Sequence, residues 1–269
     1  MYHELFKKYR DKNRATLKSR ESVNLEDSGI PKEMLSEMFM SDQEKGIAPP
    51  PLQKPVPNNA VVIDLVAMED NDLGDMSLKK AIAIRKSHRV FTEEQLTLKE
   101  LSFLLWSMNG VKEVHKEKVW TMRTVPSGGA RHPIETYLIV DRVENLDTGI
   151  YRYLPLTHQL LLIKKENGVM KRFGEKCVDQ KFIATSAVIF VWTVVPYRTE
   201  WRYSVMSYKT TAIDVGHICQ NLHLATESIG AGTCAIASYK QTETDMFLEV
   251  DGNDEFALYL APVGKCSID

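Results

Sequence analysis

The 269-residue sequence is poor in cysteine and has no C-x-x-C pair. The four cysteines are widely spaced: Cys177, Cys219, Cys234 and Cys266. This spacing argues against a zinc knuckle or a dithiol redox site. The histidines do not suggest a metal site either, because His217 and His223 lie six residues apart and fall on different faces of a predicted helix. We expect no bound metal, and cysteines that pack as small apolar side chains.

Long apolar runs and a strong net charge are also missing. No apolar stretch approaches the roughly 18 residues that a membrane-spanning helix needs, and the N-terminal "MYHELFKKYRDKNR" lacks the apolar core of a secretory signal. A formal net charge of -2 gives no reason to expect nucleic acid or an anionic membrane as a partner. The composition is that of a globular protein, with a cytoplasmic location as the expectation.

A proline-rich segment divides the chain. Residues 1–46 are polar and helix-prone, and residues 48–59, "APPPLQKPVPNN", contain five prolines that favour an extended path. This segment is either a linker or an arm that wraps the domain or a partner subunit, and the sequence does not choose. We expect a helical, proline-rich arm over residues 1–74 and one compact domain over residues 75–269.

Three helices are predicted within that domain. The first, capped by Ser77, runs through "LKKAIAIRK" and places Leu78, Ala81 and Ile82 on one apolar stripe. The second follows a Thr97-x-x-Glu100 capping box and ends at Asn109-Gly110. The third is a long buried helix over residues 211–229.

Four apolar runs are typical of strands. They cover residues 134–140, 159–164, 187–195 and 255–263. The third run is apolar on both faces, which indicates a central strand. Helices and strands in this order predict an α+β fold.

A glycine loop precedes the first of these strands. Residues 126–130, "PSGGA", place a hydroxyl and two adjacent glycines between Pro126 and Pro133. Glycine lets the backbone approach a ligand that would clash with a Cβ atom. The loop is either an ordinary tight turn or the docking place of a flat cofactor.

The end of the first helix carries a second candidate site. If the chain extends after the helix, Arg85, Ser87 and Arg89 point to one side, because strand side chains alternate. Two guanidinium groups and a hydroxyl then form a phosphate clamp. Alternatively, these basic residues only complement the dipole at the helix end.

A stretch of small residues, 228–239, follows the long helix. Small side chains allow the backbone N–H groups of Ala237 and Ser238 to reach the edge of a planar ring, such as N5 of a flavin. Tight helix–strand packing explains the same composition equally well. Lys265 follows a glycine at the end of the last strand and has meaning only together with the other segments.

Together, these segments resemble the nitroreductase superfamily, and within it the SagB-type dehydrogenase branch. The resemblance covers residues 77–265 and rests on four motifs: "R-x-S-x-R-x-F" at 85–91, "PSGGARHPIETYLIV", "GIYRYLPLTHQLLLI" and "AIDVGHICQNLHLATESIGAGTCAI". It implies a mainly antiparallel central sheet flanked by helices, an FMN cofactor, and a homodimer with FMN at the interface. Helix 211–229 is the candidate dimer core, although it also suits the core of a monomer.

The resemblance also implies roles for single residues. Arg85, Ser87 and Arg89 would contact the FMN phosphate and the O2 side of the ring, with Arg89 stabilising reduced flavin. Pro126, Ser127, Gly128, Gly129 and Ala130 would contact ribityl and phosphate. Ala237 and Ser238 would donate near N5 and O4, and Lys265 would reach the phosphate.

One position departs from the branch. Peptide-azoline dehydrogenases carry a catalytic Lys-Tyr pair, and the matching residues here are Arg202 and Tyr203. Arginine is a poor general base because it does not deprotonate in proteins. Arg202 would therefore orient a substrate or stabilise charge. Tyr203 would either donate or accept a proton or be a partly buried structural tyrosine. This departure puts azoline oxidation in doubt.

We therefore expect an FMN oxidoreductase that transfers hydride at N5. It would either oxidise a small molecule or peptide, or reduce a nitro compound or quinone with NAD(P)H. The absence of a G-x-G-x-x-G fingerprint does not decide between these, since a nicotinamide can stack directly on a flavin. The alternative is a non-catalytic, flavin-binding partner of a peptide-modifying complex, with residues 1–59 as a docking arm.

Overall fold

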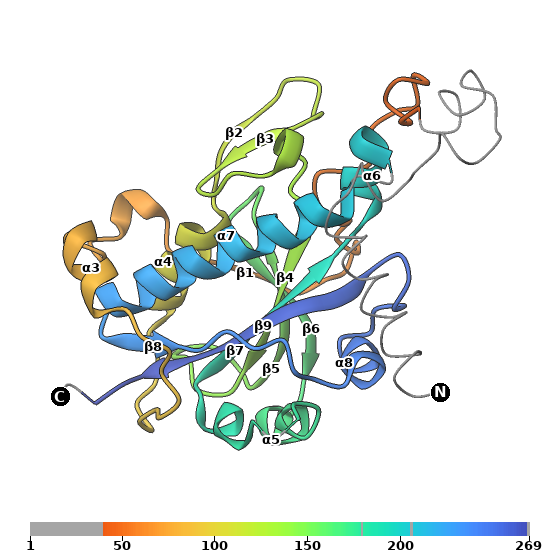
Figure 1. The fold of residues 1–269 in the computed structure, drawn as a ribbon. Helices are drawn as coiled ribbons and strands as arrows, with labels where there is room; N and C mark the ends of the chain where they lie inside the picture. Colours follow the sequence, from red (N-terminus) through yellow and green to blue (C-terminus); the bar gives the residue numbers. More distant parts are fainter. Residues whose placement is uncertain (1–39, 179, 205–206, 268–269) are drawn as a thin grey trace, which may run out of the picture.

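Seven strands form one sheet in the order β1-β6-β5-β4-β7-β9-β8, and every neighbouring pair is antiparallel. The structure is a computed structural model, and it describes residues 40–178, 180–204 and 207–267 (Figure 1). The strands are β1 (Val62–Asp64), β4 (Ile134–Val140), β5 (Gly149–Leu154), β6 (Gln159–Lys165), β7 (Val188–Val194), β8 (Ala231–Thr233) and β9 (Phe256–Lys265). A separate two-stranded ribbon pairs β2 (Val111–Val114) with β3 (Thr121–Arg123).

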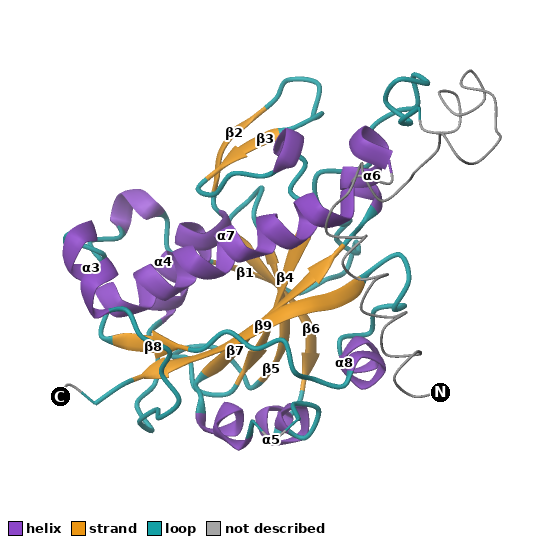
Figure 2. Ribbon diagram, viewed as in Figure 1, coloured by secondary structure: helices purple, strands orange, loops and turns teal. Residues whose placement is uncertain are grey.

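Helices cover both faces of the sheet (Figure 2). One face packs against α4 (Leu98–Asn109) and α7 (Ser207–Ser228), and the other against α5 (Val169–Gly174), η4 (Lys181–Thr185) and α8 (Gln241–Phe247). The remaining elements are η2 (Met68–Asp70), α3 (Leu78–Ile84), η3 (Gly128–Ala130) and α6 (Tyr197–Tyr203). This architecture confirms the predicted α+β fold with a mainly antiparallel sheet.

A separate hydrophobic core lies on each face of the sheet, and the central strand β7 contributes to both. In β7, Phe190 and Trp192 belong to the core under α4 and α7, whereas Ile189 and Val191 belong to the core under α5. Successive side chains of a strand point to opposite faces, so a strand between two helical layers must be apolar at every position. The predicted central strand at 187–195 is confirmed as β7.

The predicted helices are present with small shifts at their ends. Thr97 and Glu100 form the expected reciprocal capping box, and Gly110 ends α4. The long helix begins four residues earlier than predicted and ends at Ser228. Sequence patterns did not reveal the strands β1, β2, β3, β5 and β8 or the helices α5, α6 and α8, most of which are short. Among the described residues, no helix is long and apolar enough to cross a membrane.

Helix α3 differs from the prediction in where it ends and in which side chains it buries. It ends at Ile84, earlier than predicted, and only Ala81 is buried, whereas Leu78 is 65% and Ile82 is 58% exposed. The predicted apolar stripe therefore does not face the core of this chain. The small Ala81 lies at the contact, and the larger side chains of the stripe remain at the surface.

The described part of the proline-rich arm is packed on the domain. Leu52 is buried, and Trp201 donates its indole N–H to the carbonyl of Ile47 at 2.8 Å. Further along, Val62–Asp64 enters the sheet as the edge strand β1. Within residues 40–74 the arm thus wraps its own domain. The boundary at residue 75 stays a prediction, and residues 1–39 lie outside the described part.

Buried arginines hold this arm. Four arginine side chains that are at least 96% buried donate to its carbonyl groups: Arg131 to Pro50, Arg198 to Pro51, Arg123 to Leu52, and Arg152 to Lys54 and Pro55. An extended proline-rich chain has no internal hydrogen bonds, so its buried carbonyls need donors from elsewhere. Guanidinium groups supply several donors each.

The carboxylate of Glu135 is buried among these guanidinium groups. It is 97% buried and forms an ion pair with Arg198 and a hydrogen bond with the backbone N–H of Lys54. Burial alone would raise the pKa of Glu135, but the charge and hydrogen bond of Arg198, together with the Arg152 charge and the Lys54 N–H, outweigh it and lower that pKa. Arm and domain therefore share one buried charged network.

We predict that Arg198→Met lowers the free energy of unfolding by about 3 kcal/mol, because it leaves the Glu135 carboxylate buried without its ion-pair partner. Urea unfolding measures this change. Adding Glu135→Gln should recover part of the loss, since a buried amide costs less than a buried charge. The exposed Lys116→Met is the control, expected within about 0.5 kcal/mol of wild type. A loss for Arg198→Met no larger than for Lys116→Met would contradict the network's role.

Candidate functional site

The arginine segment, residues 85–89, extends directly after α3. The helix ends with Arg85 in an extended conformation, and the N–H of His88 donates to the carbonyl of Thr233 in β8 at 2.9 Å. The chain therefore follows the path on which the predicted clamp depends. Within the described residues, the side chains of Arg85, Ser87 and Arg89 form no hydrogen bond or ion pair, and Arg89 lies 6.0 Å from the centre of the Phe182 ring.

The small-residue stretch after β8 presents free backbone donors. Ile236 is fixed by reciprocal hydrogen bonds with Leu260 in β9. The next two residues, Ala237 and Ser238, are exposed, and their N–H groups donate to no other described residue. Both N–H groups are therefore open to a ligand, and the ring-edge contact stays a prediction.

The ammonium group of Lys265, which we expected to reach a phosphate, contacts groups of its own chain. Its ammonium group forms an ion pair with Glu100 and donates to the carbonyl of Ile229. Glu100 also accepts the capping hydrogen bond of α4 from the N–H of Thr97. Lys265 thereby joins the last strand, the start of α4 and the end of α7, and its charge is already compensated. The structure gives this residue less support as a phosphate ligand than Arg85 or Arg89.

The glycine loop, residues 126–130, is anchored to α7. The Ser127 hydroxyl donates to Asp214 Oδ2 at 2.6 Å, and the Gly128 N–H donates to Asp214 Oδ1 at 3.2 Å. The Ser127 oxygen in turn accepts from the His132 N–H at 2.9 Å. Burial raises the pKa of Asp214 despite these hydrogen bonds. The serine hydroxyl that we expected to face a ligand thus holds the loop in place.

The two glycines leave room for side chains of this chain. A Cβ atom on Gly128 would lie 2.1 Å from the methyl group of Thr210, and one on Gly129 would lie 2.7 Å from Cδ of Arg202 and 2.8 Å from the hydroxyl of Tyr203. Gly129 also has a φ of +61°, which other residues adopt at a cost. Contacts within the protein therefore require glycine at both positions, independently of any ligand.

The predicted catalytic pair lies directly on this loop. Arg202 and Tyr203 come from the last turn of α6, both are partly buried, and the guanidinium carbon is 5.8 Å from the centre of the tyrosine ring. Neither side chain has a hydrogen bond to another described residue. The structure thus brings Arg202, Tyr203 and the glycine loop together.

The two groups of candidate residues are far apart in one chain. The glycine loop is tied to Asp214 near the start of α7, whereas the arginine segment is tied to Glu227 near its end. Thirteen residues of continuous helix separate these anchors, which is about 20 Å at 1.5 Å per residue. Figure 1 shows α3 beside the C-terminal end of α7 and α6 beside its N-terminal end. One phosphate group therefore cannot contact both within one chain.

Three positioning residues escaped the sequence analysis: Asp214, Glu227 and His132. The first two lie in the motif that carried the family resemblance, as "DVGH" and "ATES", but a carboxylate in a long helix has no distinctive spacing. His132 stands in "GGARHP" and has the unusual φ of +46°. Only the tertiary structure shows what these side chains hold.

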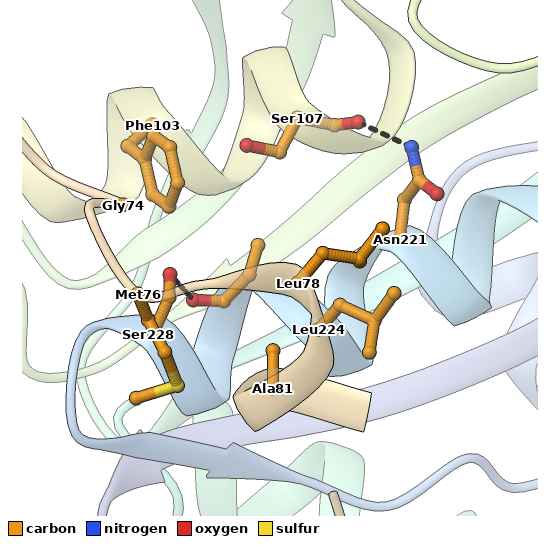
Figure 3. A pocket seen from close by; sticks show the side chains of 10 residues that line it. Gly74, Met76, Leu78, Ala81, Phe103, Ser107, Asn221, Leu224 and Ser228 are labelled. Atoms are coloured by element: carbon orange, nitrogen blue, oxygen red, sulfur yellow. Dashed lines mark hydrogen bonds between the residues drawn. The ribbon is translucent and has the colours of Figure 1, made fainter. Parts of the chain in front are cut away.

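A hollow of about 250 Å³ between α3, α4 and α7 is separate from both groups. Met76, Leu78, Phe103 and Leu224 line it, and Asn221 donates across it to the carbonyl of Ser107 at 2.9 Å (Figure 3). Its volume is below the usual range for cofactor sites, and none of the predicted site residues lines it. Over the described residues, no group of three or more metal-ligating side chains is present.

The model of the Nitroreductase family matches residues 82–265. The protein belongs to the Nitroreductase family. This assignment makes it a nitroreductase-family oxidoreductase, in agreement with the sequence analysis at the level of the superfamily.

Individual relatives agree with this assignment. A Methanocaldococcus jannaschii protein named as a nitroreductase is 30% identical over 202 residues, which are 75% of this chain and 98% of that protein. The trifolitoxin-processing protein TfxB of Rhizobium leguminosarum bv. trifolii is 30% identical over 140 residues, 51% of this chain but 38% of that protein. A crystal structure of a Ralstonia eutropha protein named as a nitroreductase has the same fold, with a TM-score of 0.64 at 23% identity, covering 83% of this chain and 100% of that one.

We predict that stability falls more steeply below pH 6.5 in the wild type than in His132→Asn. Burial, with Arg123 and Arg131 nearby, lowers the pKa of His132 to about 2, so the folded protein keeps this ring neutral. Unfolded histidine binds a proton near pH 6.5. As the pH falls below that value, protonation favours the unfolded chain, by up to about 1.4 kcal/mol per pH unit. Asparagine tolerates a positive φ and does not titrate.

Urea unfolding of both proteins at several values between pH 7 and pH 5 tests this prediction. The difference in unfolding free energy between wild type and His132→Asn should shrink as the pH falls. Parallel curves over this range would show that His132 is not held neutral.

Proposed function

We propose that this nitroreductase-family protein is an FMN-dependent oxidoreductase whose flavin sites are each shared between two copies of the chain. The observation that carries the proposal is the separation of the candidate residues along α7. Arginine segment and glycine loop are both expected at the phosphate, yet their anchors on α7 are about 20 Å apart. Two antiparallel copies of α7 packed about a two-fold axis would bring one copy's arginine segment to the other's glycine loop.

The residues present fit FMN. Arg85 and Arg89 are cations without an ion-pair partner among the described residues, and Ser87 lies between them. Such a group suits a dianionic phosphate. The free N–H groups of Ala237 and Ser238 suit the acceptor edge of an isoalloxazine ring. The buried Arg198 is paired with a carboxylate and a carbonyl of its own chain, whereas Arg85 and Arg89 present their charges to an anionic ligand.

An exposed stripe of residues on α7 offers a contact surface for a second copy of the chain. Ile213 is 50% exposed, and Ala212, Gly216, His217 and Gln220 are exposed on the same side of the helix. A Cβ atom on Gly216 would meet no atom within 4 Å. Small and apolar residues at helical spacing on a surface are typical of a helix–helix contact. The other side of α7 fills the core of its own chain. The helix therefore suits both a role in that core and a role in the dimer contact.

The chain's own residues would divide the work at such a site. Bound FMN supplies two-electron hydride transfer at N5. Arg89 would favour the negative charge of reduced flavin near N1 and O2. Arg202 would orient the substrate by its fixed charge, and the Tyr203 hydroxyl would donate or accept a proton. Both side chains lie on the glycine loop and so would act at the partner's arginine segment.

The proposed direction of electron flow follows from the resemblance to the SagB-type branch. The SagB-type motifs and the relation to a toxin-processing protein favour oxidation of a peptide or small molecule over reduction of a nitro compound or quinone by NAD(P)H. A second candidate is a flavin-binding, non-catalytic member of a peptide-modifying complex in the cytoplasm. The arginine at position 202, where peptide-azoline dehydrogenases have lysine, favours it.

The visible spectrum of the protein purified without added flavin tests the cofactor assignment. We expect a resolved flavin band, FMN as the released compound, and two FMN molecules per dimer. A colourless protein that also takes up no added FMN would overturn the proposal. Turnover with candidate donors then separates the oxidoreductase from the non-catalytic flavoprotein.

We predict that Ile213→Glu yields a monomer with FMN occupancy below about a tenth of wild type, because a charge on the α7 stripe opposes a symmetric contact. Light scattering after size exclusion and the flavin absorbance measure both effects on one sample. Met246→Glu, at a 72% exposed position on α8, is the matched control and should change neither. A monomeric Ile213→Glu protein that keeps its FMN would contradict the shared site.

A further inference from the structure

Glu227, in α7, contacts two residues of the arginine segment. Its Oε1 accepts a hydrogen bond from the backbone N–H of Lys86 at 3.1 Å and lies 2.9 Å from Nε2 of His88. The carboxylate is buried, and the His88 side chain is 13% exposed. The two residues that Glu227 contacts are the ones that alternate with Arg85, Ser87 and Arg89.

The inward position of His88 constrains the residues next to it. In an extended chain, neighbouring side chains point to opposite sides. His88 is turned toward α7 and β8, where a Cβ atom on Gly232 would lie 2.4 Å from its ring carbon Cγ. With His88 held on the inner side, the neighbouring Ser87 and Arg89 are exposed, whereas Arg85 is half-buried, and burial together with the Arg85 charge lowers the pKa of His223 in α7. The contacts of Glu227 thus fix the backbone at Lys86 and the ring of His88, and the clamp residues stand between and beside these two.

The position of Glu227 is electrostatically unfavourable and needs a reason. It lies in the last turn of α7, where the helix dipole disfavours negative charge. Burial of a carboxylate costs further free energy. Beside a phosphate site, a negative charge would also repel the ligand. Two donors, the Lys86 N–H and the His88 ring, explain why an acceptor side chain stands here.

We propose that Glu227 is the positioning residue of the arginine segment: its carboxylate preorganises residues 85–89 so that Arg85 and Ser87 meet the flavin phosphate, and Arg89 the ring, without further ordering. The inference rests on the proposed FMN function. Preorganisation raises affinity because the cost of ordering the side chains is met before the ligand arrives. Glu227 acts through the arginine segment and is not expected to touch the flavin.

The test compares FMN with riboflavin, which lacks the phosphate, on flavin-free protein. Glu227→Ala should weaken FMN binding about ten- to a hundredfold, the range typical when a residue that orients ligand-binding groups is removed. Riboflavin binding should weaken clearly less than FMN binding, because riboflavin lacks the phosphate contacts of Arg85 and Ser87 and keeps only the ring contact of Arg89. Glu227→Gln keeps an acceptor oxygen without the charge and should bind FMN at least as tightly as wild type.

Matched controls separate positioning from stability. Glu255→Ala removes another buried carboxylate, one that accepts from Thr193 away from the arginine segment, and should leave the preference for FMN unchanged. If Glu227→Ala does not fold, His88→Leu removes one of the two contacts and should also weaken FMN selectively.

Two results would overturn the proposal. Unchanged or tighter FMN binding by Glu227→Ala would make the carboxylate an electrostatic neighbour only. Equal losses for FMN and riboflavin would make it a general structural residue. Wild-type protein that binds neither flavin would instead refute the FMN function itself, so the two failures are distinguishable.

Discussion

The rigid length of α7 is the constraint on which the site depends. Asp214 near its start holds the glycine loop, and Glu227 near its end holds the arginine segment. Because a helix does not shorten, these two anchors stay about 20 Å apart along α7 in every folded copy of the chain. A ligand that needs both must find them on different copies. The buried side of α7 completes the core under the sheet, and its exposed side is available to a second α7.

Buried arginine side chains hold the proline-rich arm close to the glycine loop. Arg131 and Arg198 saturate carbonyls of the proline-rich segment, and Arg131 directly follows the glycine loop in the sequence. Trp201, next to Arg202, is bound to the carbonyl of Ile47. The arm therefore supports the elements that carry Arg202 and Tyr203. This explains why a segment outside the family match is packed so closely on the domain.

Sequence patterns predicted the parts of the fold that follow from local chemistry. The capping box at Thr97 and the doubly apolar run of β7 are sufficient signals, and both were confirmed. Short edge strands such as β1 carry too few residues for a pattern. The exposed Ile82 shows another limit, since an apolar stripe does not reveal whether it faces its own core or another chain. The candidate site was predicted as residue types, but the internal pairing of Lys265 with Glu100 depends on contacts distant in sequence.

Mixing two defective variants tests the shared site most directly. Arg85→Gln with Arg89→Gln disables the arginine segment, and Gly129→Asp places a negative charge on the glycine loop; neither protein should bind FMN as a homodimer. Subunit exchange between them produces about half mixed dimers, each with one intact site, so FMN binding should return to about a quarter of the wild-type value. Mixed dimers that bind no FMN, although wild-type dimers do, would contradict a site built from two copies of the chain.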